Sequence, residues 1–126
     1  MRAVDTNILV RLVTRDDPEQ VIAAESFIAK GAWVSHLVLA ETLRVPESVY
    51  GIDARRRAIA VEMLRHHTSL TLQDPEVVDA ALLHFRRKPS LGFSDCLILE
   101  SARKAGHLPL GTFDRVLGKL DGAHGL

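Results

Sequence analysis

Four short apolar segments alternate along the chain with longer stretches of helical periodicity, and this alternation constrains the fold more than any other feature. The segments are "RAVD" (2–5), "AWVS" (32–35), "LTLQ" (70–73) and "LPLGT" (108–112). Strands that are separated by helices are joined by crossover connections, which produce a mostly parallel sheet covered by helices. We therefore expect an α/β protein, a three-layer α/β/α sandwich around a central, mostly parallel sheet of four or five strands.

Two helix starts are marked by capping residues. In "RDDPEQ", Asp17 is a suitable N-cap, Pro18 suits the first helical position and Gln20 can complete a capping box. The helix that follows should bury Val21, Ile22, Ala24, Phe27 and Ile28. The stretch "QDPEVVDAALLHFRRK" repeats the pattern with Asp74, Pro75 and Glu76, and its expected buried positions are Val77, Val78, Ala81, Leu82 and Phe85.

Length and composition limit the class of protein. The 126 residues are suited to a single domain over 1–126, with the glycine-containing residues 118–126 as a loosely ordered tail. Sixteen Lys and Arg balance sixteen Asp and Glu, so net charge alone does not attract a polyanion. The single Cys96 cannot form an internal disulfide. Because the apolar runs are too short to cross a membrane, we expect a cytoplasmic protein without membrane contact.

Four acidic residues stand where predicted strands end or predicted helices begin. Asp5 follows the first strand, Glu41 is early in the helix after the second, Asp95 lies in "LGFSDCLIL", and Asp114 comes just after the last strand. Ligands of open α/β sheets bind outside the carboxyl ends of the strands. Each acid also has an ordinary interpretation: Asp5, Asp95 and Asp114 can favour a helix start. Glu41 is harder to explain in this way, because a glutamate in an apolar stretch costs desolvation unless it is paired.

The chemistry of such a set of acids points to a metal ion. Clustered carboxylates repel one another and destabilise a fold unless a cation offsets their charge. Carboxylate oxygens without His or Cys partners suit Mg²⁺ or Mn²⁺, and the histidines show no metal-binding spacing. Such ions activate water and stabilise charge on a phosphate leaving group. The pattern therefore predicts hydrolysis of phosphodiester bonds.

Polar neighbours of the acids are candidates for supporting roles. Thr6, Asn7, Ser94 and Thr112 can orient carboxylates, and each is equally suited to a local turn or cap. Arg11 and Arg15, about one and two turns beyond Asp5, are the candidate phosphate contacts. Only 5% of the residues are aromatic, so a platform on which bases could stack is not evident.

The stretches "AVDTNILVRLVTRDDPEQ", "LAET", "SVYG", "LGFSDCLIL" and "GTFDRVL" closely resemble the PIN-domain family and, within it, the VapC-like toxins of bacterial toxin–antitoxin pairs. The resemblance implies that Asp5, Glu41, Asp95 and Asp114 are catalytic and bind Mg²⁺ or Mn²⁺, with Thr112 as an accompanying hydroxyl. It also implies an endoribonuclease that cleaves RNA, forms a homodimer and is inhibited by a cognate antitoxin protein.

Other functions share parts of this pattern. A structure-specific DNA nuclease of the wider PIN and flap class would have the same acids, and a catalytically inactive PIN-fold interaction protein would have the same fold. A phosphatase with an aspartate nucleophile would require a second Asp two residues after the first, where this chain has Asn7.

One stretch departs from the pattern of the family. In "ETLRVPESVYG", Pro46 removes a hydrogen bond to the carbonyl of Thr42. We therefore expect the helix to kink between Thr42 and Pro46 or to stop near Val45, with Glu41 still facing the site.

Overall fold

The protein is described by a computed structural model of residues 1–126, in which the side chains of residues 45–50 are not described. The chain divides into two compact units, Met1–Pro75 and Glu76–Leu126, and each is described by itself. Twelve elements follow one another, six of them α-helices and five of them β-strands, so the predicted α/β class is confirmed.

The first unit contains a three-stranded parallel sheet in the order β1-β2-β3. Its strands are β1 (Arg2–Ala3), β2 (Ala32–Val34) and β3 (Leu70–Leu72), in register through Arg2 opposite Ala32 and Ala32 opposite Leu70. Two helices connect each pair of neighbouring strands: α1 (Thr6–Thr14) and α2 (Pro18–Ile28), then α3 (His36–Tyr50) and α4 (Ala54–His66). These are the crossovers that parallel pairing requires.

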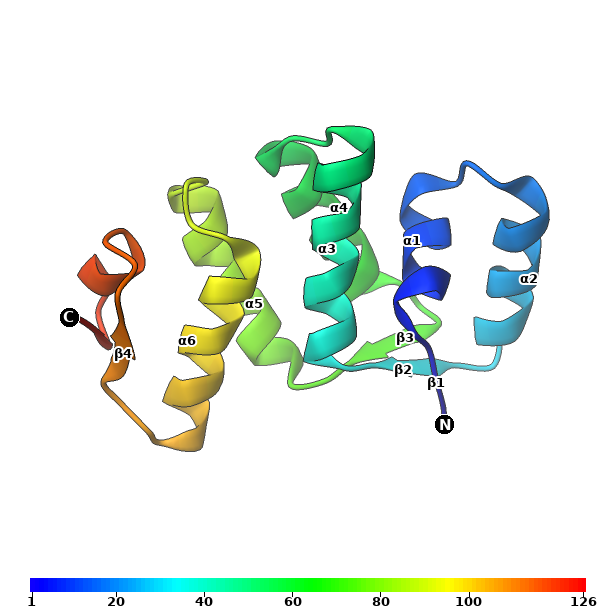
Figure 1. Cartoon of the computed structure of the whole chain (residues 1–126). Helices are drawn as coiled ribbons and strands as arrows, with labels where there is room; N and C mark the ends of the chain where they lie inside the picture. The colour runs from blue at the N-terminus through cyan, green and yellow to red at the C-terminus, as the bar shows by residue number, and fades with distance from the viewer. The chain divides into compact units, whose positions relative to one another are not determined.

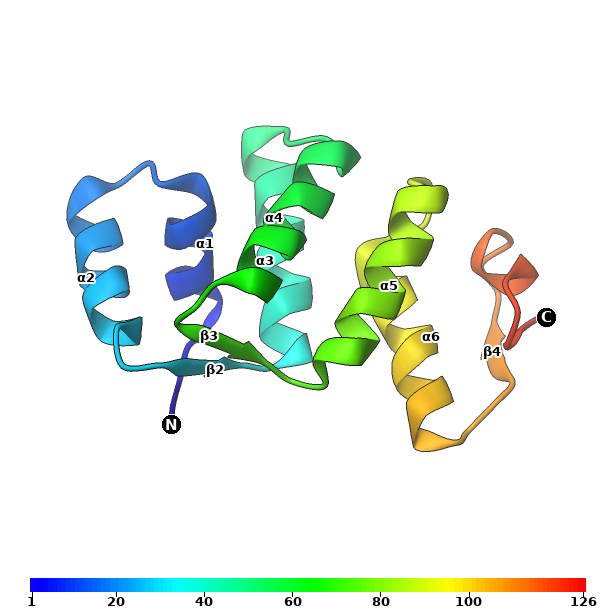
Figure 2. The ribbon, with the colours of Figure 1, turned by 180° about the vertical axis from the view of Figure 1, so that it is seen from behind.

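Helices α1 and α3 lie side by side and leave the same edge of this sheet (Figure 1). Each begins just after a parallel strand, α1 after β1 and α3 after β2, so their amino-terminal turns are neighbours (Figures 1 and 2). The interior between the helices and the sheet is filled by fully buried aliphatic side chains, among them Leu9, Ile28, Val34, Leu39, Val61 and Leu64. This packing fixes the first turns of α1 and α3 relative to each other.

The second unit contains the helices α5 (Pro75–Arg87), which begins at the boundary, and α6 (Phe93–Ala105). A two-stranded parallel sheet follows, made of β4 (Leu110–Thr112) and β5 (Ala123–Gly125), with the short 3₁₀-helix η1 (Leu117–Lys119) between them. The core includes Val78, Phe85, Cys96 and Leu99, and the rings of Phe85 and Phe93 meet edge to face with centroids 5.9 Å apart.

The structure confirms the four predicted strands and both predicted helices, α2 and α5. Asp17 caps α2 by accepting a hydrogen bond from the backbone N–H of Gln20 at 3.1 Å. All five expected positions of α5 are buried. On α2, however, Ile22 is 69% exposed and Phe27 is 38% exposed, contrary to expectation. The buried face of α2 follows the spacing i, i+3, i+7 through Val21, Ala24 and Ile28, which leaves Ile22 and Phe27 beside it.

Three features differ from expectation or go beyond it. The five strands are divided into sheets of three and two, whereas one sheet of four or five strands was expected. Residues 118–126 were expected to be a loosely ordered tail, but Ala123–Gly125 form β5, because the short connection through η1 returns the chain alongside β4. A stop of α3 near Val45 does not occur, since the helix extends to Tyr50. The alternative, a kink between Thr42 and Pro46, lies partly outside the described residues.

Candidate functional site

The first pair of acids, Asp5 and Glu41, is linked through Thr6, the residue that follows Asp5. Asp5 follows β1, and Thr6 is the first residue of α1. The Thr6 hydroxyl donates a hydrogen bond to Oε2 of Glu41 at 2.8 Å. This contact crosses from the first turn of α1 to the second turn of α3. The adjacent starts of the two helices therefore bring Glu41 beside the residue that follows Asp5.

Asp5 is the N-cap of α1. Its Oδ1 accepts a hydrogen bond from the backbone N–H of Ile8 at 3.2 Å, and its backbone is extended, as expected for a cap. The ordinary interpretation of Asp5 is therefore correct. It does not exclude metal binding, because a carboxylate has about four acceptor positions on its two oxygens and this cap uses one.

Glu41 is exposed, which overturns the reason for which the sequence singled it out. The expectation was a glutamate within an apolar stretch that needs a partner to offset desolvation. In α3 the buried face is formed by Leu39, Thr42 and Leu43, and Glu41 lies outside it. Among the described side chains of α3, the buried polar one is Thr42, whose hydroxyl donates to the carbonyl of Val38 at 2.7 Å. Glu41 remains a candidate because of its bond with Thr6.

The second pair, Asp95 and Asp114, belongs to the second unit. Asp95 lies in the first turn of α6 and is partly buried, whereas Asp114 is exposed just after β4. Burial raises the pKa of the Asp95 carboxyl above its ordinary value of 3.8, and the negative charge of Asp114 raises this pKa further. A divalent cation would offset the repulsion between two such carboxylates.

Local backbone geometry surrounds each member of this pair. Gly92 precedes α6, and a Cβ at Gly92 would lie 3.4 Å from Oδ2 of Asp95, at ordinary van der Waals contact with the carboxylate. The Asp114 carboxylate accepts hydrogen bonds at Oδ1 from the backbone N–H groups of Val116 at 2.9 Å and Leu117 at 2.8 Å. The Thr112 hydroxyl accepts a bond from the N–H of Asp114 at 3.0 Å, so Thr112 supports the backbone of this acid.

The other predicted supporting residues are placed as follows. Asn7 and Ser94 are both exposed. Asn7 lies two positions after Asp5, and Ser94 directly precedes Asp95. Arg11 forms an ion pair with Asp16, with Nη1 and Oδ1 2.8 Å apart, and Arg15 pairs with Glu25 at 3.2 Å. Exposed pairs of this kind contribute only about 0–1 kcal/mol.

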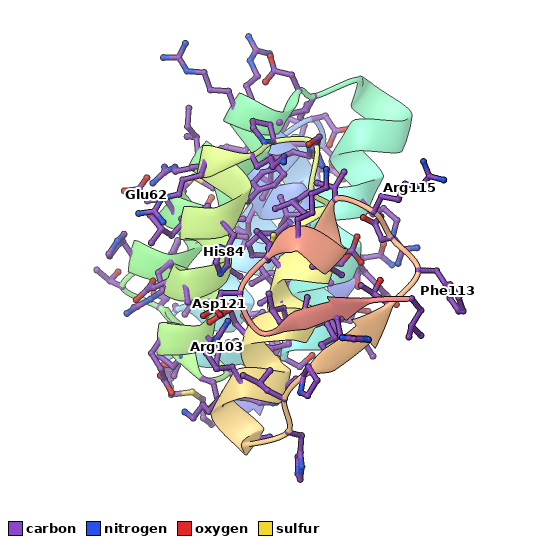
Figure 3. The ribbon with its side chains drawn as sticks, turned by 90° about the vertical axis from the view of Figure 1, so that its left-hand side faces the viewer. Glu62, His84, Arg103, Phe113, Arg115 and Asp121 are labelled. Carbon is purple, nitrogen blue, oxygen red and sulfur yellow. The ribbon has the colours of Figure 1, made fainter. Side chains whose placement is uncertain are left out.

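Phe113 is a residue that the sequence analysis missed. Its side chain is 82% exposed between Thr112 and Asp114 and projects from the edge of the β4–β5 pair (Figure 3). Only its position within "GTFDRVL", next to an acid after a strand, could have drawn attention to it. An exposed ring beside the acid offers a stacking surface, although the aromatic content of the chain is low.

The donor set suits a hard cation. Asp5, Glu41, Asp95 and Asp114 offer only oxygen atoms. Three histidines instead hydrogen-bond within the protein: His36 with the carbonyl of Gln73, His67 with the N–H of Ser69, and His84 with Glu100. In the part of the chain that the structure describes, no group of three or more His, Cys, Asp or Glu side chains is arranged to hold a metal ion, and the acids come as one pair in each unit.

A cavity of about 210 Å³ lies elsewhere in the first unit, between α1, α3 and α4. Its walls are mostly apolar and include Val13, Leu43, Ile59 and Met63, with Arg56 and Arg57 as its charged residues. None of the acids whose side chains are described lines it, so it is not the candidate site. Among the described residues, no helix has the length and apolar character needed to cross a membrane.

A single family model covers the segments that contain both acid pairs. The model of the PIN domain matches residues 2–123, nearly the whole chain and both units. No curated protein and no solved structure gave a match. PIN domains are typically nucleases and generally use divalent metal ions, in agreement with the oxygen-only acids described above. The chain belongs to the PIN domain family.

Proposed function

We propose that this protein is an endoribonuclease that depends on Mg²⁺ or Mn²⁺ and hydrolyses phosphodiester bonds of RNA. In this proposal the metal ligands are Asp5 and Glu41 of the first unit and Asp95 and Asp114 of the second. The family match supports the proposal, because residues 2–123 include the segments that contain both acid pairs. A divalent cation bound by these acids would activate water and offset charge on the phosphate.

The remaining side chains have supporting tasks in the proposal. The Thr6 hydroxyl holds the Glu41 carboxylate in one orientation, and Thr112 holds the backbone at Asp114. Arg11 and Arg15 bind phosphate groups after exchange of their present carboxylate partners. The exposed ring of Phe113 favours RNA with unpaired bases as the substrate, because such bases can stack on an aromatic side chain.

The biological setting that we propose is that of a cytoplasmic toxin. Its partners would be a cognate antitoxin protein and a second copy of the chain in a homodimer. The support is the resemblance of "AVDTNILVRLVTRDDPEQ" and "LGFSDCLIL" to the VapC-like toxins. Two observations test this setting: arrest of growth after induction of the chain, relieved by the product of a neighbouring small reading frame, and a dimeric mass in light scattering.

The direct test is cleavage of matched single-stranded RNA and DNA by the purified protein with Mg²⁺, Mn²⁺ or a chelator. We expect cleavage of RNA with either metal and none with the chelator. Asp95→Asn should abolish it, whereas Asp53→Asn, at an acid that caps α4, should not. Undiminished cleavage by Asp95→Asn would disprove the mechanism. Cleavage of DNA alone would favour the DNA nuclease, and no cleavage of either strand would favour the interaction protein.

A further inference from the structure

The guanidinium of Arg103 connects α6 to the segment that leads into β5. Its Nε donates to both oxygens of Glu100 at 3.2 Å. Its Nη2 donates to the main-chain carbonyl of Asp121 at 2.6 Å, and the two residues lie together in Figure 3. One planar side chain thus spans two contacts, on its own helix and on the chain just before β5.

Glu100 gives this connection a rigid base. Its side chain is buried, and its Oε2 also contacts Nε2 of His84 on α5 at 3.1 Å. A buried carboxylate destabilises the fold unless it is paired, so the loss of either partner of Glu100 would lower the stability of the protein. The two bonds to Glu100 therefore hold the Arg103 side chain in one orientation.

Gly122 completes the contact on the other side. Its φ is +91°, and a Cβ at this position would lie 2.8 Å from Nη2 of Arg103. The glycine allows the backbone to lie directly against the guanidinium, which no larger residue permits without displacing it. The conformation and the contact together explain why glycine stands at this position.

A short series of hydrogen bonds leads from this point to Asp114. The carbonyl of Gly122 accepts a bond from the N–H of Leu110 at 2.8 Å, at the start of β4. At the other end of the strand, the carbonyl of Thr112 accepts a bond from the N–H of Leu126 at 2.9 Å. The Thr112 hydroxyl then accepts from the N–H of Asp114. Through the β4–β5 pair, a shift of residues 121–122 would therefore move the backbone that carries Asp114.

We propose that Arg103 is a positioning residue that sets the separation of Asp95 and Asp114. Asp95 and Arg103 are on the same helix about two turns apart, and Arg103 fastens to that helix the β4–β5 pair that carries Asp114. Arg103 touches neither the metal nor the RNA in this scheme. The inference rests on the proposed function, because it assumes that this acid pair binds the cation.

Arg103→Ala is the principal variant, and Arg87→Ala, which removes an exposed arginine from the last turn of α5, is its matched control. In the metal-free protein we expect hydrogen exchange of Arg103→Ala to rise more at the β4–β5 amides than at those of α6, where Glu100 loses one of its partners. Calorimetry should show a dissociation constant for Mn²⁺ raised about tenfold, the range for residues that orient metal ligands. At saturating Mn²⁺ the variant should regain the wild-type kcat, which a loss of folded protein would not allow.

A cycle with Gly122 separates this specific contact from a general weakening of the fold. Gly122→Ala should also raise the dissociation constant for Mn²⁺, because its methyl group displaces the guanidinium. In the Arg103→Ala background the same substitution should add little. Additive effects, or wild-type Mn²⁺ affinity and exchange in Arg103→Ala, would overturn the inference while leaving the proposed function intact. If the wild-type protein bound no Mn²⁺, both the inference and the proposed function would be overturned, although hydrogen exchange would still show whether Arg103 holds β5 in place.

Discussion

Asp5 caps α1 and, in the proposed function, also binds the metal, and two substitutions separate these roles. Asparagine is as good a cap as aspartate, so Asp5→Asn keeps an acceptor for the N–H of Ile8 but removes the charge. Alanine removes both. We expect the free energy of unfolding of Asp5→Asn to be within about 0.5 kcal/mol of the wild-type value, whereas that of Asp5→Ala should be lower by about 1 kcal/mol.

The structure sets these magnitudes. The cap bond of 3.2 Å is at the long end of the range for N–H···O contacts, and Asp5 is exposed, so a loss near the middle of the range for caps is appropriate. In a chain of this size, 1 kcal/mol corresponds to about 3–5 °C in Tm. Cleavage should fall more than about 100-fold in both variants, since even residues that only orient metal ligands contribute up to that factor.

The assay is thermal unfolding with chelator, followed by unfolding and RNA cleavage with Mn²⁺. Asp17 is the matched control, because it caps α2 through Gln20 at 3.1 Å. Asp17→Ala should lose a similar amount of stability and keep its activity. If Asp5→Asn kept both its cleavage and its stabilisation by Mn²⁺, Asp5 would be a cap alone and the assignment of the metal site would fail.

Three further predictions concern other residues of the two units. Because the folded-state pKa of Asp95 is raised by burial and by Asp114, its ionised form weakens the fold as the pH rises through that pKa. With chelator, Asp95→Asn should therefore have a higher Tm than the wild type at pH 7, and the difference should vanish below about pH 4; a lower Tm at pH 7 would contradict this. Burial raises the pKa of the Cys96 thiol to about 12, so Ellman's reagent should react with it in guanidinium but not in the native protein at pH 8. Thr6→Val should weaken Mn²⁺ binding about tenfold and Thr6→Ser should preserve it; equal affinity in the two would show that the bond to Glu41 has no role.

Much of the fold could be predicted from the sequence because the signals are local. The capping residue Asp17, the proline that follows it and the apolar spacing of α5 each act within one or two turns. The prediction failed where distant packing decides the outcome. Ile22 is as apolar as Val21, and only the position of α2 against its neighbours determines which of them is buried.

The candidate site shows the same division between local and distant effects. The four acids could be named from their motifs; Asp5 has the cap bond that its sequence indicates, and Asp114 accepts bonds from the backbone N–H groups that follow it. The contact between Thr6 and Glu41 joins residues of two helices, and the connection from Arg103 to residues 121–122 joins a helix to a strand. Neither has a periodic or motif-based signal in a single sequence.

The exposure of Asp5, Glu41 and Asp114 has a consequence for how this protein can change over time. None of these three carboxylates supports the core, so in the proposed function the loss of any one would remove the chemistry and leave a folded protein with nearly the same outer surface. In that case a single substitution would convert an active enzyme into an inactive relative with almost the same surface. Selection on the reaction itself, rather than on folding, is what would keep these residues acidic.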